Sequence, residues 1–136
     1  LAQRMNHNIG NYKELISSLK RAGVSSIILV GPVPQWTKDL HDILVHDLDN
    51  VPKKLLSFIN HDIIETNEEL SVEFSSYPGV SFIDIIDLFC DQNGCLVYLG
   101  DDVEVGITTY DYGHLTPIAS EYVAEKIRPY FTGANN

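Results

Sequence analysis

Basic residues are scarce in this chain. Its 136 residues include 9 lysines and arginines against 19 aspartates and glutamates, which gives a formal net charge of −10. An acidic surface of this size repels phosphate backbones and anionic membrane faces. Binding to nucleic acid is therefore disfavoured.

Long apolar runs are also missing. No stretch approaches the roughly 18 to 20 residues that a membrane-spanning helix needs, and the N-terminus shows no signal-peptide pattern. The chain begins at Leu1 rather than at methionine. We therefore expect it to be a piece of a larger product, so the missing targeting signals say nothing about its compartment.

Cysteine occurs only at Cys90 and Cys95, within FCDQNGCLVY. The spacing is too wide for a C-x-x-C redox motif, and no second cysteine pair completes a structural zinc site. The two residues could form a small disulfide across the turn at 91–94, or they could remain reduced thiols in a loop. If the disulfide forms, the compartment is oxidising.

The remaining composition is that of one globular domain. The chain is 44% hydrophobic and 21% charged, which is ordinary for a folded protein. A chain of this length buries roughly 68% of its unfolded surface. We expect a single domain over residues 1–136.

The first half predicts a helix followed by a strand. Apolar residues recur at helical spacing over residues 5–22, and this pattern stops at Gly23. The run at 27–30, IILV, predicts a strand buried on both faces, as in a parallel sheet. Gly31-Pro32-Val33-Pro34 ends that strand.

The second half alternates in the same way. A surface excursion with a short helical stretch is predicted over 35–53, a long helix from Lys54 to about Phe74, a strand over 80–86 and a long loop over 90–113. Thr116 suits an N-cap and Pro117 the first position of a last helix, which has an apolar stripe. This order predicts an α/β three-layer sandwich, a parallel sheet flanked by helices. Ligands of such sheets bind at the C-terminal ends of the strands.

The segment DYGH, residues 111–114, lies in the last loop before that helix. A catalytic imidazole needs a partner that fixes its tautomer and stabilises the imidazolium, and a carboxylate does both. His114 would act as general base and acid for a hydroxyl nucleophile, with Asp111 orienting it. On these four residues alone, a helix-capping or ion-pairing role for His114 is the simpler explanation.

The residues that flank DYGH favour the catalytic interpretation. TTYDYGHLTPIAS, preceded by a C-x-x-x-x-C pair, resembles the last block of SGNH (GDSL-like) hydrolases, most closely the SGNH domains fused to membrane-bound acyltransferases of the acyltransferase-3 type. The G-P-x-P stretch at 31–34 is similar to a segment of the same domains. The resemblance implies a flavodoxin-like SGNH fold and a Ser-His-Asp triad containing His114 and Asp111. It also implies paired cysteines, here Cys90 and Cys95.

The chain departs from the family pattern in what it lacks. It contains no G-D-S block for the nucleophile and no G-x-N-D for the oxyanion hole, and Ala119-Ser120 replaces a small Gly-Ala pair. No serine has a strand-to-turn context, and nothing marks Asn8 or Asn11 as the family's asparagine. We expect the C-terminal part of an SGNH domain, lacking its N-terminal strand and inactive alone.

Other candidate residues have simpler explanations. His41, His46 and His61 stand near acidic residues and could bind a metal, but solvated helix faces explain them better. Trp36 and Tyr77 could line a carbohydrate-binding surface or simply pack. Asp84 and Asp87 end a strand, where one could shape the site, although an N-cap role suits Asp87 better.

Two functional hypotheses result. The first is an extracytoplasmic O-acyltransferase or esterase domain, on the periplasmic face of a bacterial inner membrane, that moves acetyl or other acyl groups to or from glycan hydroxyls. The implied partners are lipopolysaccharide, O-antigen or peptidoglycan as acceptor, and an acyl donor passed from a membrane domain. The resemblance implies no metal or organic cofactor. The second hypothesis is a non-catalytic, SGNH-derived module that binds a glycan or a protein.

Overall fold

The computed structural model describes residues 2–45 and 50–132, the first seven of these by backbone alone. The helices are α1 (Ala2–Arg21), α2 (Leu40–Leu44), α3 (His61–Phe74), α4 (Ile86–Phe89), α5 (Val103–Gly106) and α6 (Pro117–Thr132). The strands are β1 (Ile27–Val30), β2 (Lys54–Leu55), β3 (Val80–Ile83), β4 (Cys90–Asp91) and β5 (Gly94–Leu96).

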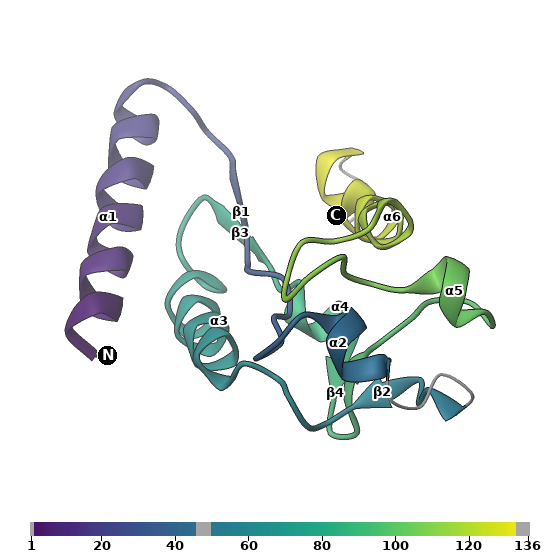
Figure 1. The fold of residues 1–136 in the computed structure, drawn as a ribbon. Helices are drawn as coiled ribbons and strands as arrows, with labels where there is room; N and C mark the ends of the chain where they lie inside the picture. The colour runs from purple at the N-terminus through teal and green to yellow at the C-terminus, as the bar shows by residue number, and fades with distance from the viewer. Residues whose placement is uncertain (1, 46–49, 133–136) are drawn as a thin grey trace.

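A parallel pair of strands, β1 and β3, forms the centre of the fold, with Ile27 opposite Val80 and Val30 opposite Ile83. Helices α1 and α3 lie on one side of this pair and α6 on the other (Figure 1). The predicted three-layer α/β arrangement with a parallel sheet is confirmed.

Alternation along the two strands assigns their side chains to the two layers. Ile27 and Leu29 pack with a core formed by α1, α3 and Val80. Ile28 and Ile83 pack instead with α6, on a second core that includes Ala119, Tyr122, Val123 and Ile127. The predicted apolar stripe of the last helix therefore covers the second face of the sheet.

Helix α1 ends as its sequence predicts. Gly23 has φ 92°, a left-handed conformation that favours glycine. Gly23 N–H donates to Lys20 O and Val24 N–H donates to Leu19 O, the two bonds of a Schellman cap. No helix among the described residues is long and apolar enough to cross a membrane.

The prediction of one helix from Lys54 to Phe74 is wrong in its first part. Lys54 and Leu55 form strand β2, which pairs antiparallel with β5, and helix α3 begins only at His61. Asn60 caps α3, because its side chain accepts a hydrogen bond from Asp62 N–H. A side chain that hydrogen-bonds to nearby backbone favours a helix start at that residue. The helix therefore begins after Asn60, although the apolar spacing continues on both sides of it.

The segment predicted as a long loop, 90–113, contains regular structure. Strands β4 and β5 form an antiparallel hairpin with Cys90 opposite Cys95, and β2 extends this second sheet. The short helix α5 follows. Strands of two or three residues are too short to show a period in the sequence.

Strand β1 is less buried than predicted. Ile27, Ile28 and Leu29 are half-buried, and Val30 is 45% exposed. The reason is that β1 has a paired neighbour on one side only among the described residues, namely β3. The backbone bonds from Ile27 N–H to Gly79 O and from Gly31 N–H to Ile83 O fix which edge faces β3, so the peptide groups of Ile28 and Val30 face the open edge.

Candidate active site

The loop that carries Asp111 and His114 is closed at its base. Thr109 and Leu115 form an antiparallel bridge, and Tyr110 N–H donates to His114 O at 2.9 Å. Helix α6 follows directly, with Thr116 Oγ1 accepting from Ala119 N–H at 3.4 Å. The predicted N-cap at Thr116 is thus confirmed, and the loop is fixed to a regular element.

Asp111 binds both the backbone of this loop and the imidazole. Its Oδ1 accepts from the backbone N–H groups of Gly113, at 2.9 Å, and His114, at 2.8 Å. Its Oδ2 lies 2.7 Å from His114 Nδ1. One carboxylate therefore sets the turn and the ring orientation together, which is the geometry that the catalytic interpretation requires.

The electrostatics of the pair follow from these contacts. The His114 N–H, the Gly113 N–H and then the His114 side chain lower the pKa of the Asp111 carboxyl to about 2. The carboxylate is therefore ionised at neutral pH and can only accept. His114 Nδ1 must then carry the proton, which leaves Nε2 as the basic nitrogen. The His114 side chain is 76% exposed, so Nε2 is open to a substrate.

A second segment, the one that follows β1, holds this loop from the side. Trp36 N–H donates to Tyr112 O at 2.7 Å, and Leu40 N–H donates to Asp111 O at 3.3 Å. Gly113 is buried against Gln35, whose Cγ lies 2.9 Å from where a Cβ on Gly113 would stand. The G-P-x-P stretch and the D-x-x-H block thus belong to one continuous region at the C-terminal end of β1.

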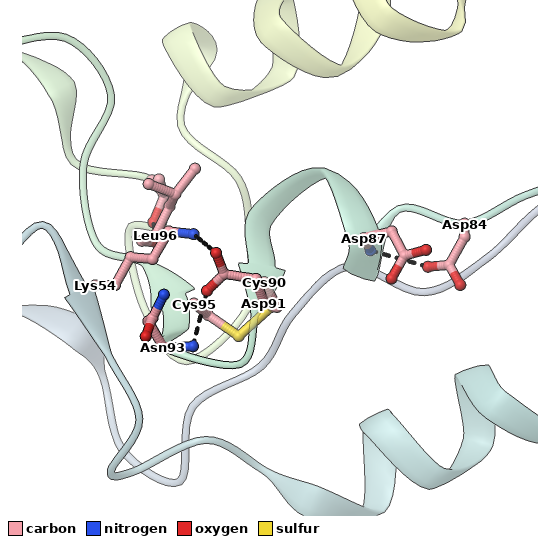
Figure 2. Close-up of a disulfide and its surroundings, with 9 residues drawn as sticks. Lys54, Asp84, Asp87, Cys90, Asp91, Asn93, Cys95 and Leu96 are labelled. Atoms are coloured by element: carbon pink, nitrogen blue, oxygen red, sulfur yellow. Dashed lines mark hydrogen bonds and ion pairs between the residues drawn. A yellow bond between two sulfur atoms is a disulfide. The ribbon is translucent and has the colours of Figure 1, made fainter.

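Asp84 and Asp87 lie just after strand β3, where the sequence placed them. Asp84 Oδ2 accepts from the buried Asn67 amide at 2.8 Å. Its Oδ1 accepts from Asp87 N–H at 3.0 Å, a bond drawn in Figure 2. The N-cap position of α4 is Ile85, and Asp87 lies inside the helix with its N–H bound by Asp84, so the N-cap prediction for Asp87 is wrong. Burial and the neighbouring Asp84 charge raise the pKa of Asp87.

These two aspartates line a cavity of about 540 Å³ between α3 and the β4–β5 hairpin, together with Asn67 and the two cysteines. Neither Asp111 nor His114 lines it. The cavity is therefore distinct from the D-x-x-H loop.

The cysteine pair forms a disulfide, which settles the alternative left open by the sequence. It closes the β4–β5 hairpin, as Figure 2 shows. Beside it, Lys54 Nζ lies 2.7 Å from Asp91 Oδ2 and lowers the pKa of that carboxyl, with the Asn93 N–H as a further cause. The disulfide thus stabilises the hairpin that pairs with β2 rather than the loop of His114.

The remaining sequence candidates are placed as follows. His41 and His61 are exposed on α2 and α3, and His46 lies outside the described residues. No group of three or more potential metal ligands occurs in the described part of the chain. Trp36 is 3% exposed and belongs to the core, and Tyr77 packs on Phe74 with ring centroids 5.6 Å apart, so both aromatics pack.

Sequence reasoning missed Gln35, Asn60 and Gly113. Asn60 Nδ2 donates to Gln35 Oε1 at 3.5 Å, in a contact between residues 25 positions apart. Gln35 directly follows the G-P-x-P stretch, which was a usable signal for its location. No local pattern could show that its side chain packs on Gly113.

Comparison with known families agrees with this geometry. Residues 2–129 match the family described as SGNH domain (fused to AT3 domains). The chain therefore belongs to the SGNH domain family, as its C-terminal motifs predicted.

A solved structure gives a more particular likeness. The periplasmic domain of a lipopolysaccharide acetyltransferase from Salmonella ser. Paratyphi A superposes with a TM-score of 0.81 at 27% sequence identity. The match covers 94% of this chain and 50% of that domain, so the chain spans about half the length of the solved structure. A search of curated proteins found no match.

Proposed function

We propose that this chain is the C-terminal part of an extracytoplasmic SGNH domain that transfers acetyl or other acyl groups to or from glycan hydroxyls. The observation that carries the proposal is the 2.7 Å contact between Asp111 Oδ2 and His114 Nδ1 in a loop that two other segments hold in place. Family membership and the likeness to a lipopolysaccharide acetyltransferase periplasmic domain support the same assignment.

The mechanism follows from the geometry of the pair. His114 Nε2 takes the proton of a serine hydroxyl, and the serine oxygen attacks the carbonyl carbon of the acyl donor. The imidazolium, stabilised by Asp111, returns the proton to the leaving group, which leaves an acyl-serine. An acceptor hydroxyl then loses its proton to Nε2 and attacks the acyl-serine. The imidazolium gives this proton to the departing serine oxygen, so the ester passes to the glycan and the free serine is restored. Water in place of the acceptor gives hydrolysis.

The serine and the oxyanion donors of this mechanism are assigned to sequence outside the chain. Support comes from the open edge of β1, next to Ile28 and Val30. A parallel strand followed by α1 and then β1 would make a right-handed β-α-β unit, and its C-terminal end would lie beside Gly31–Pro34. That stretch leads directly to the segment that contacts the Asp111–His114 loop.

Location and partners belong to the same proposal. The parent protein is membrane-anchored, receives its acyl group from a membrane domain and uses lipopolysaccharide, O-antigen or peptidoglycan as acceptor. The fusion to acyltransferase domains in this family and the disulfide support an extracytoplasmic position.

The test is acyl transfer by the complete natural protein and its variants. His114→Ala should lower kcat/KM by several orders of magnitude, because it removes the general base. Asp111→Asn should lower it by as much or less, because it removes the carboxylate that fixes the tautomer of His114. His41→Ala, which removes an exposed histidine on α2, is the matched control. Near-normal turnover in His114→Ala contradicts the assignment. Glycan binding without any transfer by the wild type favours the binding module instead.

A further inference from the structure

The segment 35–37 is paired along one side with the residues that precede α3. Thr37 N–H donates to Phe58 O at 2.7 Å, and Asn60 N–H donates to Gln35 O at 2.8 Å. These bonds make a short antiparallel ladder. It places Gln35 opposite Asn60 and Thr37 opposite Phe58.

The buried pair between these residues shows which way the others point. Trp36 and Ile59 face each other in an antiparallel bridge, 3% and 8% exposed, with their side chains in the core. Because side chains alternate along extended chain, Gln35 and Asn60 project from the opposite face. Phe58 lies in a turn next to this ladder, and its exposed ring has Lys38 Nζ 5.9 Å from its centroid. We call Gln35, Asn60 and Phe58 the amide–aromatic face.

The amide–aromatic face adjoins the Asp111–His114 loop. Trp36 N–H donates to Tyr112 O at 2.7 Å on the far side of the segment. The Nε2 of Gln35 lies 3.6 Å from where a Cβ on Gly113 would stand. Gln35 is thus next to the residue that precedes the catalytic imidazole.

The Nε2 group of Gln35 is available as a hydrogen-bond donor beside Gly113. Its Oε1 accepts from Asn60 Nδ2, and Asn60 Oδ1 is already occupied by the α3 cap. No described residue accepts a hydrogen bond from Gln35 Nε2.

Phe58 supplies an aromatic ring at an unfavourable backbone position. Its φ is 64°, the one left-handed φ outside glycine among the described residues, yet its side chain is 44% exposed. A bulky residue in that conformation is strained, and burial of its ring does not explain the strain. Such an outlier points to a functional use of the side chain.

We infer that the amide–aromatic face binds the acceptor glycan of the proposed acyl transfer, an inference that rests on the proposed function. Gln35 Nε2 donates to an oxygen of the sugar that is acylated, and the Phe58 ring stacks on the C–H face of the neighbouring sugar. Trp36 N–H donates to Tyr112 O and the next residue, Thr37, donates to Phe58 O, so a single segment separates Phe58 from the loop that carries His114.

The experiment separates acceptor binding from the chemistry of the dyad. The complete protein is assayed in two reactions: hydrolysis of p-nitrophenyl acetate, which needs no glycan, and transfer to an oligosaccharide released from the source organism's lipopolysaccharide. His114→Ala should abolish both reactions. Variants of the amide–aromatic face should impair only the second.

Phe58 gives the sharper pair of variants. Phe58→Asn removes the ring but tolerates the left-handed backbone, so it should raise the melting temperature by about 2 to 4 °C. It should also raise the acceptor KM roughly tenfold, because the stacking contact is lost. Phe58→Tyr retains the ring and should keep the acceptor KM. Phe131→Ala, at the exposed far end of α6, is the matched control.

Gln35 is tested through its donor. Gln35→Met keeps the packing against Gly113 without the N–H group. It should raise the acceptor KM with p-nitrophenyl acetate hydrolysis retained.

The outcomes distinguish the two proposals. If Phe58→Asn and Gln35→Met leave the acceptor KM within about twofold while His114→Ala abolishes both reactions, the acceptor assignment is overturned and the proposed function stands. If the wild type performs neither reaction, both fail.

Discussion

At the residue scale, Asp111 combines two roles that are usually separate. Its Oδ1 fixes the turn through two backbone N–H groups, and its Oδ2 orients the imidazole of His114. Under the proposed function, a change at this position is therefore expected to act on local backbone structure and on catalysis together. Asparagine separates the two effects, because its carbonyl oxygen can still accept at the Oδ1 position.

The low pKa of Asp111 predicts a pH dependence of folding. The folded-state pKa of about 2 lies below the ordinary aspartate value of 3.8, so the stabilisation is complete above pH 3.8 and is lost as the pH falls through about 2. We expect Asp111→Asn to flatten the stability profile between these two values. Urea unfolding of the chain at a series of pH values measures this, with Asp101→Asn as an exposed control. Identical profiles for Asp111→Asn and wild type would contradict the prediction.

The dyad could be predicted from sequence because it is local. Asp111 and His114 are three positions apart, and the cap residues Thr116 and Pro117 mark where the loop must end. Gln35 and Gly113 could not be predicted as partners. Their contact depends on how the segment after β1 lies across the molecule, and single-sequence periodicity carries no information on that.

At the element scale, the β4–β5 hairpin depends on its disulfide. The strands are two and three residues long, and a hairpin of that size is marginally stable in water. The cross-link joins its two strands to each other, and the Lys54–Asp91 ion pair fastens it to β2. Burial of Cys95 in the core of α2 and Trp36 extends the same attachment inward.

Reduction should therefore destabilise the chain. With the cysteines five positions apart, loop-closure entropy gives a loss of about 2 kcal/mol in the free energy of unfolding. Denaturant unfolding with and without dithiothreitol measures this loss. The double variant Cys90→Ala/Cys95→Ala should not respond to the reductant. A wild-type midpoint that dithiothreitol leaves unchanged would refute the expectation.

Element boundaries were predictable where caps and long periods agree. Gly23 ends α1 and Thr116 begins α6 as the sequence indicates. The region 54–60 was misassigned because Leu55 continues the apolar spacing of α3 while pairing in a sheet. Tertiary pairing overrode the local pattern there.

At the scale of the whole molecule, the sheet has an apolar open edge. Val30 is 45% exposed on it, and the peptide groups of Ile28 and Val30 point away from β3. Unpaired strand edges of this kind favour association between chains. In the proposed complete domain, the preceding strand covers this edge.

The chain alone should consequently self-associate at micromolar concentrations. Val30→Lys should shift it toward the monomer, since a charge on an edge strand opposes strand pairing. Val72→Lys, on the exposed side of α3, is the control and should have no such effect. Analytical ultracentrifugation over a concentration series provides the measurement. A wild-type chain that sediments as a single monomeric species would exclude association through this edge.

The hydrogen bonds around the Asp111–His114 loop also differ in the order in which they can form. Those within 108–116 close small loops, so they form early and at little entropic cost. The bonds from Trp36 and Leu40 to the same loop join residues more than seventy positions apart in the sequence and must form late. During folding, Asp111 and His114 are thus expected to pair before the segment after β1 fixes the position of their loop. Under mild denaturant, we expect the bonds from Trp36 and Leu40 to be lost first, while the contact between Asp111 and His114 persists.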